Sequence, residues 1–199
     1  MAGERAGTPP WRVLGGRALH TSAPFGLMGI VNITPDSFFD GGEHGDARLA
    51  VAHALRLRDE GADILDLGAE SSRPGAPALT SDEELRRLLP VLCDLRTSAS
   101  GVCLSVDTYH ASTAEAVLRC GASIINDISG CAYDPALLDV LAQYRPGYVL
   151  MHCQGRPATM QKAPRYDDVR RDVLEFFDTA LNRLVRAGLP EDRIALDPG

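Results

Sequence analysis

Six short apolar runs recur along the sequence, and each ends in a polar or glycine-rich string. A run that is apolar at nearly every position is typical of a parallel strand with both faces covered, whereas a half-exposed strand alternates. The spacing between most of these runs leaves room for a helix. We therefore expect a repeated strand and helix unit. The runs are LMGIVNIT (27–34), DILDLGAESS (63–72), VCLSVDT (102–108), SIINDISG (123–130), YVLMHC (148–153) and RIALDPG (193–199).

Helical patterns lie between these runs. In the segment 168–188, apolar residues recur at the 3.6-residue spacing of an amphipathic helix. Ser81 and Glu84 have the spacing of a capping box, which predicts the start of a helix there. Three glycines stand where a helix is expected to end before the next strand: Gly61, Gly121 and Gly188.

Six such units favour a TIM-type (β/α)8 barrel over a doubly wound α/β sheet. A complete barrel takes about 250 residues, whereas this sequence has 199 and its sixth run ends at Gly199. We therefore expect an incomplete barrel, with strands 1–6 present and strands 7–8 missing. We assign residues 1–24 to an N-terminal extension and residues 25–199 to the barrel domain. In either architecture the ligand site lies at the carboxyl ends of the strands.

The composition excludes several classes of partner. The net charge of −7 argues against a nucleic acid or an anionic membrane surface, because either would require clustered lysine and arginine. No apolar run is long enough to span a bilayer, and the first 26 residues lack the apolar core of a signal peptide. The five cysteines form no Cys-x-x-Cys pair, which indicates reduced thiols. We expect a cytoplasmic protein.

Hydrogen-bond acceptors gather at the predicted strand ends. Carboxylates and amides converging on one edge suit a ligand rich in N–H donors, such as the amino-pyrimidinone edge of a pterin or a guanine. Any one of these residues, taken alone, can instead cap the helix that follows it. The fifth strand ends on His152. The acceptors are Asn32, Asp66, Asp107, Asn126, Asp127 and Asp197.

The string AESSRPGA (69–76) adds a different group. Ser72 and Arg73 offer a hydroxyl and a guanidinium to an anionic oxygen such as that of a phosphate. The alternative is that Arg73 is a surface arginine in a turn. No Walker loop or G-x-G-x-x-G string follows any strand, which lowers the case for a nucleotide hydrolase or a dinucleotide enzyme.

Together the motifs resemble the dihydropteroate synthase family, the pterin-binding transferases of folate synthesis. The resemblance extends from Trp11 to Gly199. It implies transfer of the 7,8-dihydropterin-6-ylmethyl group from its diphosphate to p-aminobenzoate, giving 7,8-dihydropteroate and diphosphate, with Mg²⁺ as cofactor. The motifs are, in order, GIVNITPDSFFDGG, DLGAESSRPGA, LSVDT, INDISG, LMHCQGRPATMQ and LDPG.

The resemblance also implies roles for individual residues. Asn32 matches the family's asparagine that binds Mg²⁺ together with the substrate diphosphate. Asp107, Asn126 and Asp197 match the residues that hold the pterin ring. Asp36 and Asp107 are our candidates for stabilising the cation that develops on the pterin as diphosphate leaves.

Two loops complete the implied site. Ser72 matches a residue that serves the diphosphate, and Arg73 one on the aminobenzoate side. The loop from Thr34 to Phe39 is expected to close over the site and complete the p-aminobenzoate pocket, with Phe38 as one wall.

Two other hypotheses stay open at this point. A pterin-dependent methyltransferase has a similar barrel, although it has no use for a diphosphate loop. A truncated, catalytically inactive pterin-binding relative is the third reading. The family's remaining site residues, a lysine and an Arg-x-His, would lie beyond Gly199, so we expect little turnover from these 199 residues alone. The family resemblance implies that the complete protein can form a homodimer.

Overall fold

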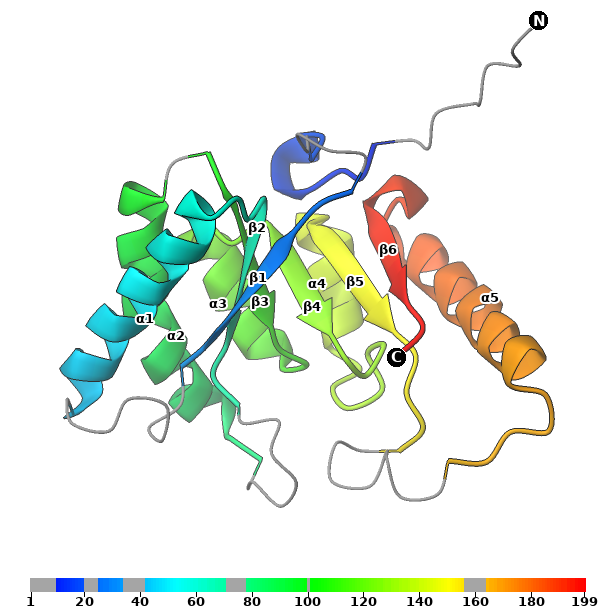
Figure 1. Ribbon diagram of the computed structural model, residues 1–199. Coiled ribbons are helices and arrows are strands. Elements are labelled where there is room, and N and C mark those ends of the chain that lie inside the picture. Colours follow the sequence, from blue (N-terminus) through cyan, green and yellow to red (C-terminus); the bar gives the residue numbers. More distant parts are fainter. Residues whose placement is uncertain (1–9, 20–24, 34–41, 71–77, 100, 156–163) are drawn as a thin grey trace, which may run out of the picture.

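A computed structural model describes residues 10–19, 25–33, 42–70, 78–99, 101–155 and 164–199, apart from the side chains of residues 42–46. Strands and helices alternate along this part of the chain (Figure 1). Its elements are the short 3-10 helix η1 (Leu14–Gly16), β1 (Met28–Asn32), α1 (Gly42–Asp59), β2 (Ile64–Gly68), α2 (Ser81–Ser98), β3 (Cys103–Asp107), α3 (Ala111–Cys120), β4 (Ile124–Asp127), α4 (Leu137–Tyr144), β5 (Gly147–Met151), α5 (Val169–Ala187), the short 3-10 helix η3 (Glu191–Arg193) and β6 (Ile194–Asp197).

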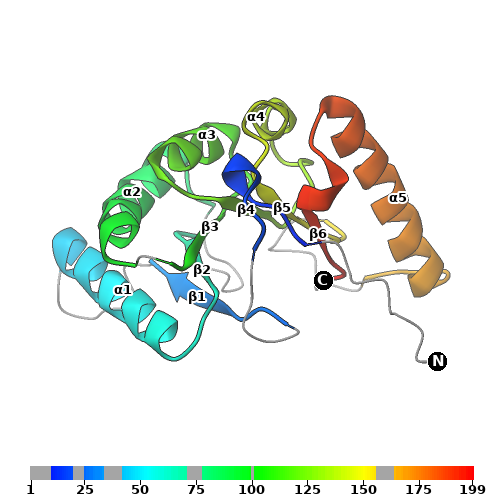
Figure 2. The ribbon, with the colours of Figure 1, turned by 90° about the horizontal axis from the view of Figure 1, so that it is seen from above.

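The six strands form one parallel sheet in the order β1-β2-β3-β4-β5-β6. Figure 2 shows that the sheet is curved and that the helices lie along its convex side. Sequential parallel strands with helices on one side are the arrangement of a β/α barrel. The predicted fold class is therefore confirmed over six strands. None of the helices in the described residues has the length and apolar character needed to span a bilayer.

The convex face of the sheet forms the main core. Successive residues of a strand point to opposite faces, so every second residue meets the helices. Most of these side chains are leucine, valine or isoleucine and are almost fully buried, which explains why the strands read as apolar runs. They include Leu65, Leu67, Val106, Ile125 and Leu150.

Helix ends follow the sequence signals in most places. Gly121 and Gly188 adopt φ values of 114° and 113° at the carboxyl ends of α3 and α5, as the pattern predicts. The predicted capping box at Ser81 is wrong. The N-cap of α2 is Thr80, whose side chain accepts from the backbone N–H of Glu83, while Glu84 turns inward and is 1% exposed.

The segment before β1 closes the amino-terminal end of the concave face. Val13 is fully buried there against the first residues of three central strands. Trp11 Nε1 donates to the carbonyl oxygen of Arg193 over 2.8 Å, which ties this segment to the turn before β6 (Figure 1). The cluster consists of Val13, Ile64, Cys103 and Ile124, with Trp11, Leu19 and Val149 packed against it.

Val13→Ala should therefore destabilise the protein although it lies outside the sheet. Removing two buried methyl groups is expected to lower the free energy of unfolding by about 2 kcal/mol, through lost burial and a residual cavity. Val185→Ala on α5, where the side chain is 45% exposed, is the matched control and should change stability by less than about 0.5 kcal/mol. Urea unfolding of both variants measures the difference. Equal stability of the two would contradict a structural role for this segment.

Candidate functional site

Strand register brings four residues into one row at the carboxyl ends of β1 to β4. Asn32 pairs with Gly68, Gly68 with Asp107, and Asp107 with Asn126. Paired residues of neighbouring parallel strands share a face, and this row lies on the concave face. We call Asn32, Gly68, Asp107 and Asn126 the rim row.

Gly68 presents no side chain in the middle of the rim row. A Cβ atom placed on Gly68 would lie 3.6 Å from Asn32 Oδ1 and 3.7 Å from Asp107 Oδ2. The two oxygens therefore flank a position that has no side chain. This arrangement lets a ligand approach the sheet between two acceptor groups.

A second row lies two residues closer to the amino ends of the strands. Asp66 pairs with Ser105 there, and both side chains are buried. Asn126 Nδ2 donates to Asp66 Oδ2 over 2.9 Å, which links the rim row to the second row. Sequence reasoning noted Asp66 at a strand end but gave it no role. Asp66 lies two residues before Gly68 in an otherwise apolar strand, so the two residues share one face of the sheet. This spacing is the sequence signal that places Asp66 at the site.

Asp197 lies on β6, at the far side of this face from Asn32. It pairs with Met151 across β5 and β6. The contact recorded for its carboxylate in the described residues is with the backbone N–H of Gly199, over 3.0 Å. The structure places Asp197 on the concave face by register, but it records no contact between Asp197 and the rim row.

Asp127 does not join the site, which corrects its expected place among the acceptors. It follows Asn126 directly, so its side chain points to the opposite face. Asp127 is fully buried and accepts from the backbone N–H groups of Ser129 and Cys131 and from the Tyr148 hydroxyl. It therefore stabilises the loop after β4.

A buried carboxylate fixes the end of β3 beside the rim row. The Thr108 hydroxyl donates to Glu84 Oε2 over 2.9 Å, and its oxygen accepts from the backbone N–H of His110 over 3.1 Å. Sequence reasoning missed this role of Glu84. The signal was present, since Glu84 shares the helix face of Leu88, Val91 and Leu95.

Several acidic side chains lie close together near the rim row, and this affects their protonation. Burial, and then the negative charges of neighbouring acids, raise the pKa of Asp107 to about 8. Burial also raises the pKa of Asp66, an effect that hydrogen bonding partly offsets. The side chain of Asp107 is half-buried, so the shift reflects its acidic surroundings as well as lost hydration. The neighbouring acids are Asp66, Glu84, Asp127 and Glu70.

Five of the predicted site residues lie outside the described part of the chain. Their roles stay predictions: Thr34, Asp36, Phe38, Ser72 and Arg73. Within the described residues, no group of three or more histidine, cysteine, aspartate or glutamate side chains has the arrangement of a metal site.

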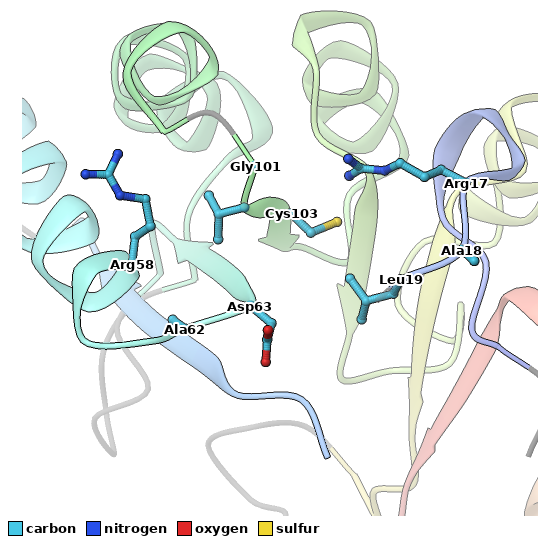
Figure 3. A pocket seen from close by; sticks show the side chains of 9 residues that line it. Arg17, Ala18, Leu19, Arg58, Ala62, Asp63, Gly101 and Cys103 are labelled. Carbon is cyan, nitrogen blue, oxygen red and sulfur yellow. The ribbon is translucent and has the colours of Figure 1, made fainter. Parts of the chain in front are cut away.

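A cavity of about 300 Å³ opens at the other end of the strands (Figure 3). Two of the charged residues that line it, Arg58 and Asp63, already have partners. Arg58 pairs with Asp59 over 2.7 Å and also donates to the carbonyl oxygen of Ser98, while Asp63 accepts from the backbone N–H of Leu27. The rim row therefore remains the better candidate site, because it lies at the carboxyl ends of the strands, where β/α barrels bind their ligands.

Comparisons with known proteins identify the family of this chain. Residues 28–199 match the model of a family described as pterin binding enzymes. A dihydropteroate synthase from Bacillus subtilis is 44% identical over 173 residues, which cover 87% of this chain and 58% of that protein. The chain thus spans less than two thirds of the length of this relative.

Solved structures show the same likeness. The dihydropteroate synthase of Xanthomonas albilineans, in complex with indole-2-carboxylic acid and 6-chloroguanine, superposes with a TM-score of 0.83 at 42% identity, covering 96% of this chain and 66% of that one. The Burkholderia cenocepacia dihydropteroate synthase complexed with 7,8-dihydropteroate gives a TM-score of 0.80 at 39% identity, covering 96% of this chain and 63% of that one.

The raised pKa of Asp107 predicts a pH-dependent effect of Asp107→Asn on stability. Between pH 3.8 and about 8 the unfolded chain has lost the proton while the folded protein keeps it, so stability falls as the pH rises through this window. Asparagine does not titrate. The melting temperature of Asp107→Asn relative to the unmodified protein should therefore increase from pH 5 to pH 8.

Thermal unfolding at several pH values measures this difference. Asp94→Asn, an exposed position on α2, is the control and should show no such trend. A constant difference between Asp107→Asn and the unmodified protein from pH 5 to pH 8 would contradict the raised pKa.

Proposed function

Because the chain belongs to the family of pterin binding enzymes, we propose that its protein is a dihydropteroate synthase. The rim row is the observation that carries this proposal, since it combines two pterin-type acceptors with an amide suited to a metal and diphosphate. The relatives reported above that carry the name dihydropteroate synthase support it. They also favour it over the methyltransferase reading.

Recognition of the pterin ring follows from the acceptors. An amino-pyrimidinone ring presents several N–H donors on one edge, and the Asp107 carboxylate and the Asn126 amide offer oxygens at neighbouring positions of the rim row. A site with buried acceptors discriminates strongly, because a ligand without the matching N–H groups leaves them unpaired.

The reaction exchanges one bond for another. The bond between the methylene carbon of the dihydropterin and the diphosphate oxygen breaks, and diphosphate leaves with the electron pair. The amine nitrogen of p-aminobenzoate then forms a bond to that carbon and loses a proton. The developing cation is conjugated with the pterin ring. The N–H donors of the bound ring and this positive charge both favour the ionised form of Asp107, whose pKa is raised in the free protein, and the ionised carboxylate stabilises the cation. Asp36 is proposed to do the same from the first loop.

The residues at the rim fit a magnesium ion. Mg²⁺ is usually held by one or two protein oxygens together with substrate phosphates and water, rather than by a cage of side chains. The Asn32 amide oxygen, at an exposed strand end beside Gly68, is such a ligand. When bound, the ion would neutralise charge on the diphosphate.

The remaining assignments belong to the proposal as well. Ser72 binds the diphosphate, and Arg73 lies on the aminobenzoate side. Thr34 and Phe38 belong to the p-aminobenzoate pocket. Asp197 completes the contacts to the pterin ring. We further propose a cytoplasmic protein that forms a homodimer, for which sedimentation of the full-length protein is the measurement.

Release of diphosphate that depends on p-aminobenzoate tests the proposed function. The full-length protein should release diphosphate from 6-hydroxymethyl-7,8-dihydropterin diphosphate only when p-aminobenzoate is present. Asp107→Asn should lower kcat/KM at least about tenfold, because it removes a charged hydrogen-bond acceptor from the ring. Asp94→Asn on α2 should keep the unmodified rate. No turnover by the unmodified protein, or normal kinetics for Asp107→Asn, would contradict the proposed function.

The metal assignment makes a separate prediction. In the presence of diphosphate, Mg²⁺ should raise the melting temperature of the unmodified protein, since a ligand that binds only the folded state stabilises it. Asn32→Ala should lose most of this increase, and chelation by EDTA should abolish it. If Asn32→Ala retained the full increase, Asn32 would not be a ligand of the ion.

A further inference from the structure

Asp66 is a buried carboxylate that the proposed reaction does not use directly. It lies on β2 with 5% of its surface exposed, one row below Gly68 on the concave face. Its partner Asn126 belongs to β4, so their hydrogen bond of 2.9 Å crosses β3. The bond therefore crosses β3 on the amino-terminal side of Asp107, which is the rim-row residue of β3.

The hydrogen bond determines which way the Asn126 side chain faces. Nδ2 and Oδ1 lie on opposite sides of the amide carbon, and Nδ2 is directed at Asp66. Oδ1 is consequently turned away from the second row. An ionised carboxylate can only accept hydrogen bonds, so it selects this orientation of the amide over the reversed one.

Stability alone gives little reason for an aspartate at this position. Asp66 Oδ1 and the Ser105 hydroxyl make no hydrogen bond of normal geometry within the described residues, although the Ser105 hydroxyl lies near enough to Asp66 to offset part of the effect of burial on its pKa. Burying a carboxylate with incomplete hydrogen bonding is costly, and an apolar side chain of similar size is often at least as stable. A group retained at such a cost is a candidate for a role in the site.

We propose that Asp66 is a positioning residue that holds the Asn126 amide with its Oδ1 acceptor directed at the pterin ring. The inference rests on the proposed function, because it assigns the ring to the rim row. Asp66 itself does not touch the ligand: it acts through Asn126, and it sets the preference for a ring edge that donates rather than accepts.

Asp66→Asn is the first test. Two facing amides can pair in either orientation, so this variant frees the Asn126 side chain to turn over. The dissociation constant for pterin, measured by isothermal titration calorimetry on the full-length protein, should rise about tenfold. The KM for the dihydropterin diphosphate should rise in parallel, while the KM for p-aminobenzoate stays unchanged. Asp94→Asn on the exposed face of α2 serves as the control, with pterin affinity close to that of the unmodified protein.

An exchange of the two residues separates positioning from packing. In the double variant Asp66→Asn with Asn126→Asp, the amide at position 66 donates to the carboxylate at position 126. The second oxygen of that carboxylate is again an acceptor that faces the ring. Pterin affinity should therefore recover to within about threefold of the unmodified protein. Such a recovery shows that the effects of the two substitutions are coupled, as is expected of two residues in contact. A residue that only fills space would show no such recovery.

The outcomes distinguish the inference from the function on which it rests. Failure of the unmodified protein to bind pterin would overturn the proposed function and the inference with it. Pterin binding by the unmodified protein, with unchanged affinity in Asp66→Asn or no recovery in the exchange variant, would overturn the inference alone. The ratio of the two KM values does not depend on the folded fraction, so it decides the matter even if a variant is partly unfolded.

Discussion

The register of the parallel strands is the constraint on which the rest of this structure depends. Because side chains alternate between the two faces with a period of two, one pairing of β1 to β4 places Asn32, Asp107 and Asn126 at the same level of the concave face. A shift of one residue in these strands, in one direction, would replace Asn32, Asp107 and Asn126 with Val31, Val106 and Ile125. Core packing on the convex face thus holds the polar groups of the site in place without touching them.

The concave face changes character along its length. Near the amino ends of the strands it is apolar and covered by Val13, and near the carboxyl ends it is acidic. Acids placed this close together repel one another, so the rim of the free protein favours bound protons or donor-rich ligands. The same repulsion that weakens the folded state at high pH therefore prepares the site for a ring with several N–H groups.

Much of this could be predicted from the sequence, because its signals are local. The glycines at 121 and 188 adopt the left-handed conformation that few other residues accept, and each of the six predicted runs overlaps one of the six strands. The roles of Asp127 and Glu84 could not be derived in the same way. In a strand covered on both faces, hydrophobicity does not reveal which residues point inward. A glutamate in the first turn of a helix is equally compatible with a cap and with a buried hydrogen bond.

The hydrogen bond from Trp11 to Arg193 joins residues separated by 182 positions. A ribosome makes Trp11 long before Arg193, so this hydrogen bond forms only after nearly all of these 199 residues have been synthesised, whereas the residues against which Val13 packs are complete once Ile124 has been made. Closing so long a stretch of chain carries a large entropic cost before any contact repays it. During synthesis, Val13 can thus cover the amino-terminal end of the concave face before the hydrogen bond to the turn ahead of β6 fixes this segment in place.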